Sequence, residues 1–125
     1  MKRATRNVEP DCVRDLLERV PRACIAVASD DGPQAQPTRF MWRDGRYLVG
    51  IPDDAACRPS SGQEIVLLID EGVHYFELRA LNVRGRLEAR EAPAGAPTGR
   101  TWFEVIPINT AAWDYAMLRE VDDED

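Results

Sequence analysis

Histidine and cysteine, the side chains most often used for acid–base, nucleophilic and metal chemistry, are few and scattered along the chain. The only histidine is His74, and the three cysteines, Cys12, Cys24 and Cys57, form no CxxC pair. A structural zinc site needs four closely spaced ligands, and a Ser-His-Asp relay needs a histidine beside its serine. We therefore expect no metal ligands and assign no catalytic acid, base or nucleophile. The odd number of cysteines indicates reduced thiols.

Arginine dominates the basic side chains of the sequence. It supplies fifteen of the sixteen basic residues. Its guanidinium can make two hydrogen bonds at once to a phosphate or carboxylate, although a GC-rich genome would also raise the arginine content. Residues 1–60 carry ten basic and nine acidic side chains, whereas residues 61–125 carry six and thirteen. A site for an anionic ligand is therefore expected in the first half of the chain.

The overall charge and hydropathy exclude several classes of partner. The 125 residues have a formal net charge of −6, which opposes general attraction to nucleic acid or to anionic lipid. No apolar run approaches the ~18 residues of a membrane span, and no apolar stretch follows the basic residues at the start. We expect a cytoplasmic protein with a single domain over residues 1–125 and no nucleic-acid or membrane partner.

The elements that must position any site begin with one helix and continue as strands. The helix is expected between Pro10 and Pro21, where apolar residues recur at helical spacing: Val13, Leu16, Leu17 and Val20. Four strands are predicted after it, over residues 23–28, 36–43, 47–51 and 65–69. Asp44-Gly45 is typical of a two-residue hairpin turn. Residues 52–63 are expected to be a crossover with a short helix.

The segment 75–90 changes its hydrophobic phase. Its apolar positions fall first on one parity and then on the other: Phe76, Leu78 and Ala80, then Val83, Leu87 and Ala89. A bulge or break within about two residues of Leu81-Asn82 would turn Phe76 and Val83 both inward. The alternative is an unbroken strand with protein on both faces.

The end of the chain is expected to hold one more strand and a short turn. After a flexible connection over residues 93–99, the strand is predicted at 102–108 and the turn at 113–118. Residues 1–9 and 119–125 are expected to be flexible tails. One helix and about six strands in hairpins predict a mainly β fold, a six-stranded antiparallel split barrel with an N-terminal helix and a short crossover helix.

Three stretches carry a resemblance to a known family: RACIAVASDDGPQAQPTRFMWRDGRYLVGI, CRPSSGQEIVLLIDEG and LNVRGRLEAR. Their order, over about residues 11–115, resembles the pyridoxamine 5′-phosphate oxidase-like, flavin-binding split-barrel superfamily. The resemblance implies a homodimer with a flavin at its interface, either FMN or a deazaflavin coenzyme.

The resemblance also implies which residues contact the flavin phosphate. Arg39 on the second strand and Arg58 in the crossover match basic residues with that role, and a guanidinium suits a phosphate because its hydrogen bonds are charge-assisted. Ser60 and Ser61, together with nearby backbone N–H groups, would complete the phosphate-binding site. The alternatives are surface or ion-pair roles for the arginines and helix capping for the serines.

The flavin ring would be gripped by strand backbone, according to the same resemblance. The matching residues are Phe40, Met41, Trp42, Gly50 and Ile51. Glycine at position 50 permits close approach to a flat ring. Trp42 could instead pack within its hairpin. Trp113 matches a terminal segment near the partner subunit and flavin, or else it is an aromatic plug on the barrel.

These expectations lead to two functional hypotheses. The first is a flavin-dependent oxidoreductase acting on a small-molecule substrate, in which the cofactor supplies the redox chemistry. The second arises because Pro59-Ser60 replaces the family's usual Asn-Leu pair. It is a dimeric split barrel without a cofactor that binds a small ligand or another protein.

Overall fold

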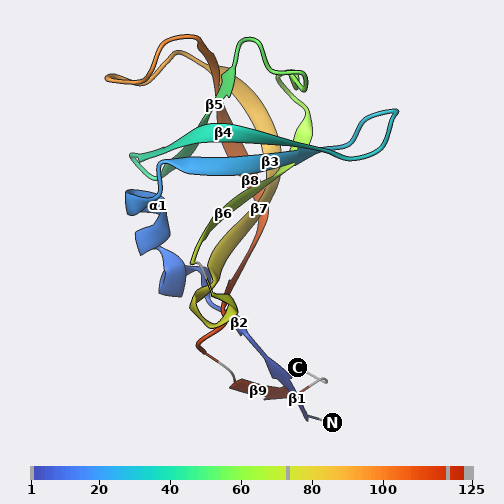
Figure 1. Ribbon diagram of the computed structural model, residues 1–125, viewed down its shortest axis with the longest axis vertical. Coiled ribbons are helices and arrows are strands. Elements are labelled where there is room, and N and C mark those ends of the chain that lie inside the picture. The colour runs from blue at the N-terminus through green and yellow to red at the C-terminus, as the bar shows by residue number, and fades with distance from the viewer. Residues whose placement is uncertain (1, 73, 118, 123–125) are drawn as a thin grey trace.

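Figure 1 shows a computed structural model of the chain, which describes residues 2–72, 74–117 and 119–122. Its elements are β1 (Lys2–Thr5), β2 (Asn7–Val8), the 3₁₀ helix η1 (Pro10–Val13), α1 (Asp15–Arg19), β3 (Arg22–Val27), β4 (Gln34–Arg43), β5 (Arg46–Pro52), β6 (Glu64–Glu71), the 3₁₀ helix η2 (Tyr75–Glu77), β7 (Arg79–Arg90), β8 (Arg100–Asp114) and β9 (Arg119–Asp122). None of the helices within the described ranges has the length and apolar character needed to cross a membrane.

Six antiparallel strands form the barrel in the order β8-β5-β4-β3-β6-β7, and pairing of β7 with β8 closes it. This arrangement confirms the predicted six-stranded split barrel. The strands alternate inward and outward, so that one contiguous core fills the interior. On β5, for example, Val49 and Ile51 are buried in this core while Arg46 is exposed outside.

The helical segment near the start packs against one end of the barrel. It is divided into η1 and α1, and its predicted apolar stripe is confirmed because all four residues are buried in the same core as the strands: Val13, Leu16, Leu17 and Val20. Arg14, Asp15 and Arg19 lie on the opposite, exposed side. The stripe therefore covers apolar residues that the open barrel would otherwise expose to water.

The predicted hairpin between β4 and β5 is confirmed. Asp44 and Gly45 have φ angles of 52° and 73°, and the flanking residues Arg43 and Arg46 are paired. Two positive φ angles are the signature of the type I′ turn, whose twist matches that of paired strands. The strands predicted at 23–28, 36–43, 47–51 and 65–69 are observed as β3, β4, β5 and β6 with small changes at their ends.

The predicted crossover helix is wrong. Residues 53–63 form turns and bends between β5 and β6, with no helical residue. Pro59 lacks a backbone N–H, and Gly62 has a φ of 90°. Both features oppose a continuous helical turn. The segment is held instead by hydrogen bonds from the N–H of Gly62 to the carbonyl of Leu87 and from the N–H of Leu87 to the carbonyl of Gln63.

The strand break expected near Leu81-Asn82 is observed where β7 begins at Arg79, but the predicted inward position of Phe76 is wrong. No bulge or break lies at Leu81-Asn82 itself. β7 is continuous through these residues, and its inward positions keep one parity from Leu81 to Leu87. Phe76 lies before the strand, in η2, and its side chain is 53% exposed. The two parities in the sequence therefore belong to two elements, and only the second faces the core.

A β-bulge does occur, but in β8. Arg84 pairs with Asn109 and Gly85 pairs with Pro107, which leaves Ile108 as the extra residue. The bulge shifts the parity of β8, so that Phe103 and Val105 face inward before it and Ala112 after it. Bulges of this kind bend a strand and increase its twist, which helps a sheet to close.

The two ends of the chain depart from the expected tails and turn. β8 extends to Asp114, beyond the predicted end at residue 108, and so contains Trp113. β2 pairs with this extension, and β1 pairs with β9 in a separate two-stranded ribbon that projects from the barrel (Figure 1). The residues expected to be tails are therefore paired with one another. The predicted turn at 113–118 is reduced to residues 115–116, and Leu118 lies outside the described residues.

Candidate functional site

The outer face of β4 and β5 carries the first group of predicted site residues. Arg39 and Met41 face outward on β4, whereas Phe40 between them is 2% exposed and belongs to the core. Arg39 is paired with Gly50, and Met41 is paired with Leu48. The alternation of β4 therefore presents one cation and one apolar side chain on the same outer strip.

A depression of about 300 Å³ lies along this part of β4. Its lining includes four predicted residues, Arg39, Phe40, Met41 and Trp42, together with the end of α1 and the β7–β8 loop. Arg43 fastens that loop by donating a hydrogen bond from Nη1 to the carbonyl of Ala94 at 2.9 Å. The depression is thus bounded by three segments that are distant in the sequence.

Arg58 occupies a different, smaller depression of about 40 Å³. Ile51, Pro59, Thr101 and Phe103 complete its lining. Strand β5 lies between the two arginines. Its Gly50 pairs with Arg39 on β4, and the next residue, Ile51, lines the depression that contains Arg58. The two arginines are therefore on adjoining parts of the barrel but do not line one depression.

The two serines of the crossover have structural partners. Ser61 accepts a hydrogen bond through Oγ from the N–H of Ala89, and the N–H of Ser60 donates to Oε1 of Gln63. These contacts tie the crossover to β7 and close its last turn. With no helix at this point, the serines do not cap one.

Trp113 lies near the opposite end of β8 from the other predicted residues. It pairs with Ala80 on β7 and Asn7 on β2, whereas Gly50 pairs with Trp102. The two tryptophans are eleven steps apart along β8, which at about 3.3 Å per residue is roughly 36 Å of strand. Within one chain, Trp113 therefore does not join the group around Arg39.

Arg39 and Arg58 are two of the exposed arginines that have no ion-pair partner among the described residues, as are Arg14 and Arg86. Neither the Arg39 nor the Arg58 side chain forms an ion pair or hydrogen bond with any residue that the structure describes. Most other described arginines are engaged; Arg100, for example, donates from Nη1 to the carbonyl of Gly50 at 3.0 Å. An unpaired guanidinium keeps its donors available for an anionic ligand.

Trp102 is a residue of this face that the sequence analysis missed. A Cβ on Gly50 would lie 2.6 Å from Cζ2 of the Trp102 indole, so the chain's own ring covers the glycine. Trp102 is 2% exposed, and its Nε1 is buried without a hydrogen-bond partner in the described structure. The surface over Gly50 is therefore not open to a second flat ring while the indole holds this position.

Asp53, in the crossover before Arg58, is held in place by two hydrogen bonds. Its Oδ1 accepts a hydrogen bond from the Thr101 hydroxyl at 2.7 Å, and its N–H donates to the carbonyl of Gly99. This carboxylate is thereby tied to the start of β8. Among the described residues, no group of three or more histidine, cysteine or acidic side chains is arranged to hold a metal ion.

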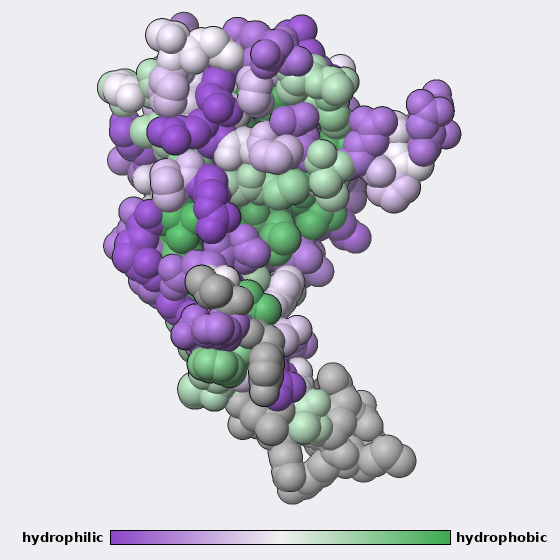
Figure 2. Space-filling view, in the orientation of Figure 1, coloured by the Kyte–Doolittle hydropathy of each residue, from purple (hydrophilic) through white to green (hydrophobic). Residues whose placement is uncertain are grey.

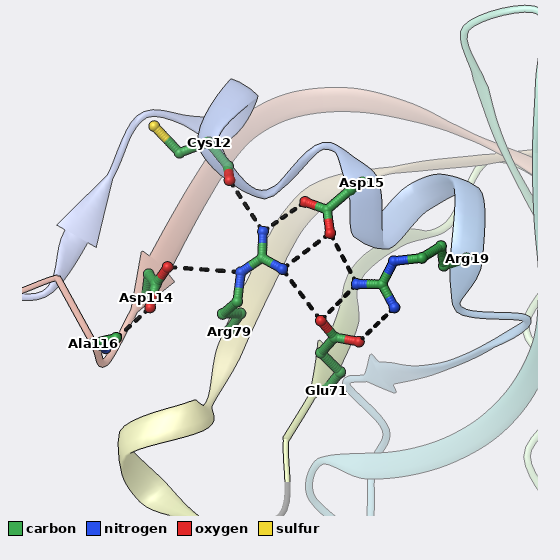
Figure 3. Close-up of polar contacts among 7 residues, drawn as sticks. All are labelled: Cys12, Asp15, Arg19, Glu71, Arg79, Asp114 and Ala116. Atoms are coloured by element: carbon green, nitrogen blue, oxygen red, sulfur yellow. Dashed lines mark hydrogen bonds and ion pairs between the residues drawn. The ribbon is translucent and has the colours of Figure 1, made fainter.

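A second polar cluster, also missed from the sequence, centres on Arg79 (Figure 3). Arg79 contacts Asp15, Glu71 and Asp114, and Arg19 contacts both Asp15 and Glu71. Hydrogen bonds from Arg79 and Arg19 lower the pKa of Asp15, and the Arg19 guanidinium lowers that of Glu71. The cluster joins α1 to β6, β7 and β8, so its role is to fasten the helix to the barrel.

Proteins of known structure share the fold of this chain. No protein-family model and no curated protein matches the sequence. An FAD-binding protein from Mycobacterium smegmatis is similar in structure, with a TM-score of 0.68, 15% identity, and coverage of 91% of this chain and 97% of that one. An FAD-binding protein from Mesorhizobium loti has a TM-score of 0.60, 13% identity and 98% coverage of both chains.

A third similar structure carries the name that the sequence resemblance suggested. It is a candidate pyridoxamine 5′-phosphate oxidase from Corynebacterium glutamicum, with a TM-score of 0.61, 12% identity, and coverage of 87% of this chain and 90% of that one. At these identities the likeness concerns the fold: the chain shares a split-barrel architecture with the three proteins.

Proposed function

We propose that the chain is a flavin-binding protein, with FMN as its cofactor, and that it acts as an oxidoreductase on a small-molecule substrate. The observation that carries this proposal is the unpaired Arg39 in a depression on the outer face of a split barrel. Proteins of the same fold include two FAD-binding proteins. A deazaflavin coenzyme has a comparable anionic tail and is an alternative ligand.

The donor set suits a phosphate better than it suits the ring. Arg39 and Arg58 would supply charge-assisted hydrogen bonds to phosphate oxygens. The backbone of residues 40–42 borders the same depression as Arg39 and would face the ring, whereas Gly50 is covered by Trp102. When bound, the flavin would supply hydride or electron transfer, and the chain's residues would hold and orient it.

A homodimer forms part of this proposal because the barrel has an uncovered apolar strip. Cys24 and Ala26 on β3 lie opposite Leu68 and Val66 on β6, and all four face outward. Figure 2 shows apolar side chains gathered over β3 and β6 between more polar regions. A second copy of the chain would cover this strip and bring its own residues to the site.

The test is a titration of the purified protein with FMN, FAD and a deazaflavin, followed by visible absorption and by quenching of flavin fluorescence. Saturable binding of one of them at one molecule per chain supports the proposal. Absence of binding by all three at micromolar concentrations contradicts it, together with the flavin-dependent oxidoreductase activity that the proposal includes. An Arg86→Ala variant is the control, since Arg86 is also exposed and has no ion-pair partner among the described residues.

A specific observation favours a second candidate, a split barrel that binds a small ligand without any flavin. The Trp102 indole covers Gly50, and the crossover that would cradle the phosphate has no helix. A colourless protein that takes up none of the three coenzymes but binds an unrelated small molecule would support this candidate.

A further inference from the structure

A separate depression of about 280 Å³ lies on the other side of Trp42 from the one beside Arg39. It is bounded by η1, the start of α1 and the β4–β5 hairpin, and it reaches Leu81 on β7. Trp42 and Leu17 line both depressions and so form the wall between them. The unpaired Arg39 and Arg58 are not part of this second depression.

The floor and one wall of this depression are apolar. Leu81 and Leu17 are 1% and 6% exposed and belong to the barrel core. Trp42 and Tyr47 are partly buried, and their rings meet edge to face with centroids 4.8 Å apart. Sites for drug-sized ligands have volumes of roughly 300–1,000 Å³, so this one fits a small ligand with an aromatic or branched apolar group.

The rim carries one cation and one anion. Arg14 and Asp11 both line the depression, and the N–H of Arg14 donates to the carbonyl of Asp11 at 3.3 Å. Neither side chain forms an ion pair with the other or with any other described residue. Burial raises the pKa of Tyr47 and the Arg14 guanidinium opposes this shift, which indicates that the guanidinium charge acts on the phenol.

We propose that this depression binds a small zwitterionic amino acid with an aromatic or branched apolar side chain. Its carboxylate would pair with Arg14 and its ammonium group with Asp11, while its side chain would contact Trp42 and Tyr47 above Leu81. A ligand with only one of the two charges would pair with only one of the exposed side chains of Arg14 and Asp11 and would lack the second charge-assisted contact. The proposal requires no flavin and stands or falls separately from the proposed function.

The test compares three ligands that share a phenyl ring. Isothermal titration calorimetry would measure L-phenylalanine, 3-phenylpropanoate, which lacks the ammonium group, and 2-phenylethylamine, which lacks the carboxylate. We expect L-phenylalanine to bind roughly tenfold more tightly than either analogue, because each missing charge removes a charge-assisted contact. Absence of measurable binding of all three up to millimolar concentrations would overturn the proposal.

Two substitutions test whether Arg14 binds the carboxylate of the ligand and Asp11 binds its ammonium group. Arg14→Gln should weaken L-phenylalanine and 3-phenylpropanoate alike, by roughly tenfold. Asp11→Asn should weaken L-phenylalanine but leave 3-phenylpropanoate unchanged or slightly tighter. Both side chains are exposed, so the variants should fold, and Arg86→Gln serves as the control for loss of an unpaired arginine elsewhere. Equal affinities in the wild type and Arg14→Gln would overturn the assignment even if a ligand binds.

Discussion

Gly50 and Trp102 lie opposite each other on β5 and β8, and the indole covers the glycine so closely that a Cβ there would stand 2.6 Å from Cζ2. The sequence resemblance assigns Gly50 to close contact with a flavin ring. The structure gives the glycine another reason to be present, because the buried indole of Trp102 needs the same space. In the structure, the flat ring that approaches Gly50 closely is the indole of the chain's own Trp102. Contact of Gly50 with a flavin stays a prediction.

Gly50→Ala should therefore destabilise the fold. The added methyl group must displace Trp102, which is buried at 2% exposure, and overpacking of this kind costs about 1–3 kcal/mol of unfolding free energy. Urea denaturation would measure the loss. The matched variant is the double substitution Gly50→Ala with Trp102→Phe, in which the smaller ring should recover part of the stability lost. A strictly additive double variant would contradict direct packing of the two residues.

The cluster around Arg79 predicts sensitivity to acid. The pKa values of Asp15 and Glu71 are lower in the folded protein than their ordinary values of 3.8 and 4.5. A carboxylate with a lowered pKa stabilises the folded state above its ordinary pKa and loses that contribution as the pH falls toward its folded pKa. We therefore expect stability to decline below about pH 5 as these groups take up protons.

The control for this prediction is Arg79→Met, which keeps the length of the side chain but removes the charge. Urea midpoints measured between pH 7 and pH 3 should fall less steeply in the variant than in the wild type. Because Asp15 is about half exposed, solvent screening limits the difference. Parallel curves for the two proteins would show that the cluster contributes nothing to the acid response.

The barrel could be predicted from the sequence because its strands alternate apolar and polar residues and its turns have strong local signals. Asp44-Gly45 is one such signal, and the four predicted strands before residue 70 are all observed. The prediction of a crossover helix was wrong. Pro59 has no backbone N–H to donate, Gly62 has a positive φ, and the residues around them have only a weak preference for helix. The parity change at residues 76–83 was real, but the break before β7 caused it.

The candidate site was less predictable because it depends on contacts between distant segments. The four predicted residues of β4 line one depression because they are neighbours on one strand at the edge of that depression. The positions of Arg58 and Trp113 depend instead on the path of the crossover loop and on the length of β8. The sequence predicts only that Trp102 lies in a strand. The alternation of residues along a strand does not show which neighbour an outward-facing aromatic side chain covers. The same holds for Arg79, whose partners come from four other elements, η1, α1, β6 and β8.

Arg58→Ala should weaken FMN binding by roughly tenfold to hundredfold, because a charge-assisted contact to a partly buried phosphate contributes ~1.5–3 kcal/mol. Arg86→Ala, which removes another exposed arginine without an ion-pair partner among the described residues, should leave the affinity unchanged. Fluorescence titration of each variant would measure the dissociation constant. Identical constants for the two variants would mean that Arg58 does not contact the coenzyme.

Static light scattering should give twice the 14.1 kDa mass of one chain. The outward apolar strip on β3 and β6 is the surface that we expect to be buried, so Val66→Asp should shift the protein toward the monomer. Ala92→Asp, which places the same charge at an exposed position in the β7–β8 loop, is the control. A monomeric wild type at all concentrations would contradict the dimer and any cofactor site that needs a second copy.

The last prediction concerns the bulge in β8. Ile108 is the extra residue opposite the Arg84-Gly85 step, and its side chain is 48% exposed. Deleting it would leave one residue of β8 for each residue of β7, with Val105 and Ala112 still facing inward. We therefore expect the variant without Ile108 to keep a cooperative unfolding transition, at reduced stability because the bend is lost.

Deletion of Arg84 is the matched control, since β7 is in regular register with β6 and every core residue on one side of the deletion would turn outward. Thermal unfolding followed by near-ultraviolet circular dichroism would distinguish the two deletions, and an unfolded protein without Ile108 beside a folded one without Arg84 would reverse the assignment of the bulge.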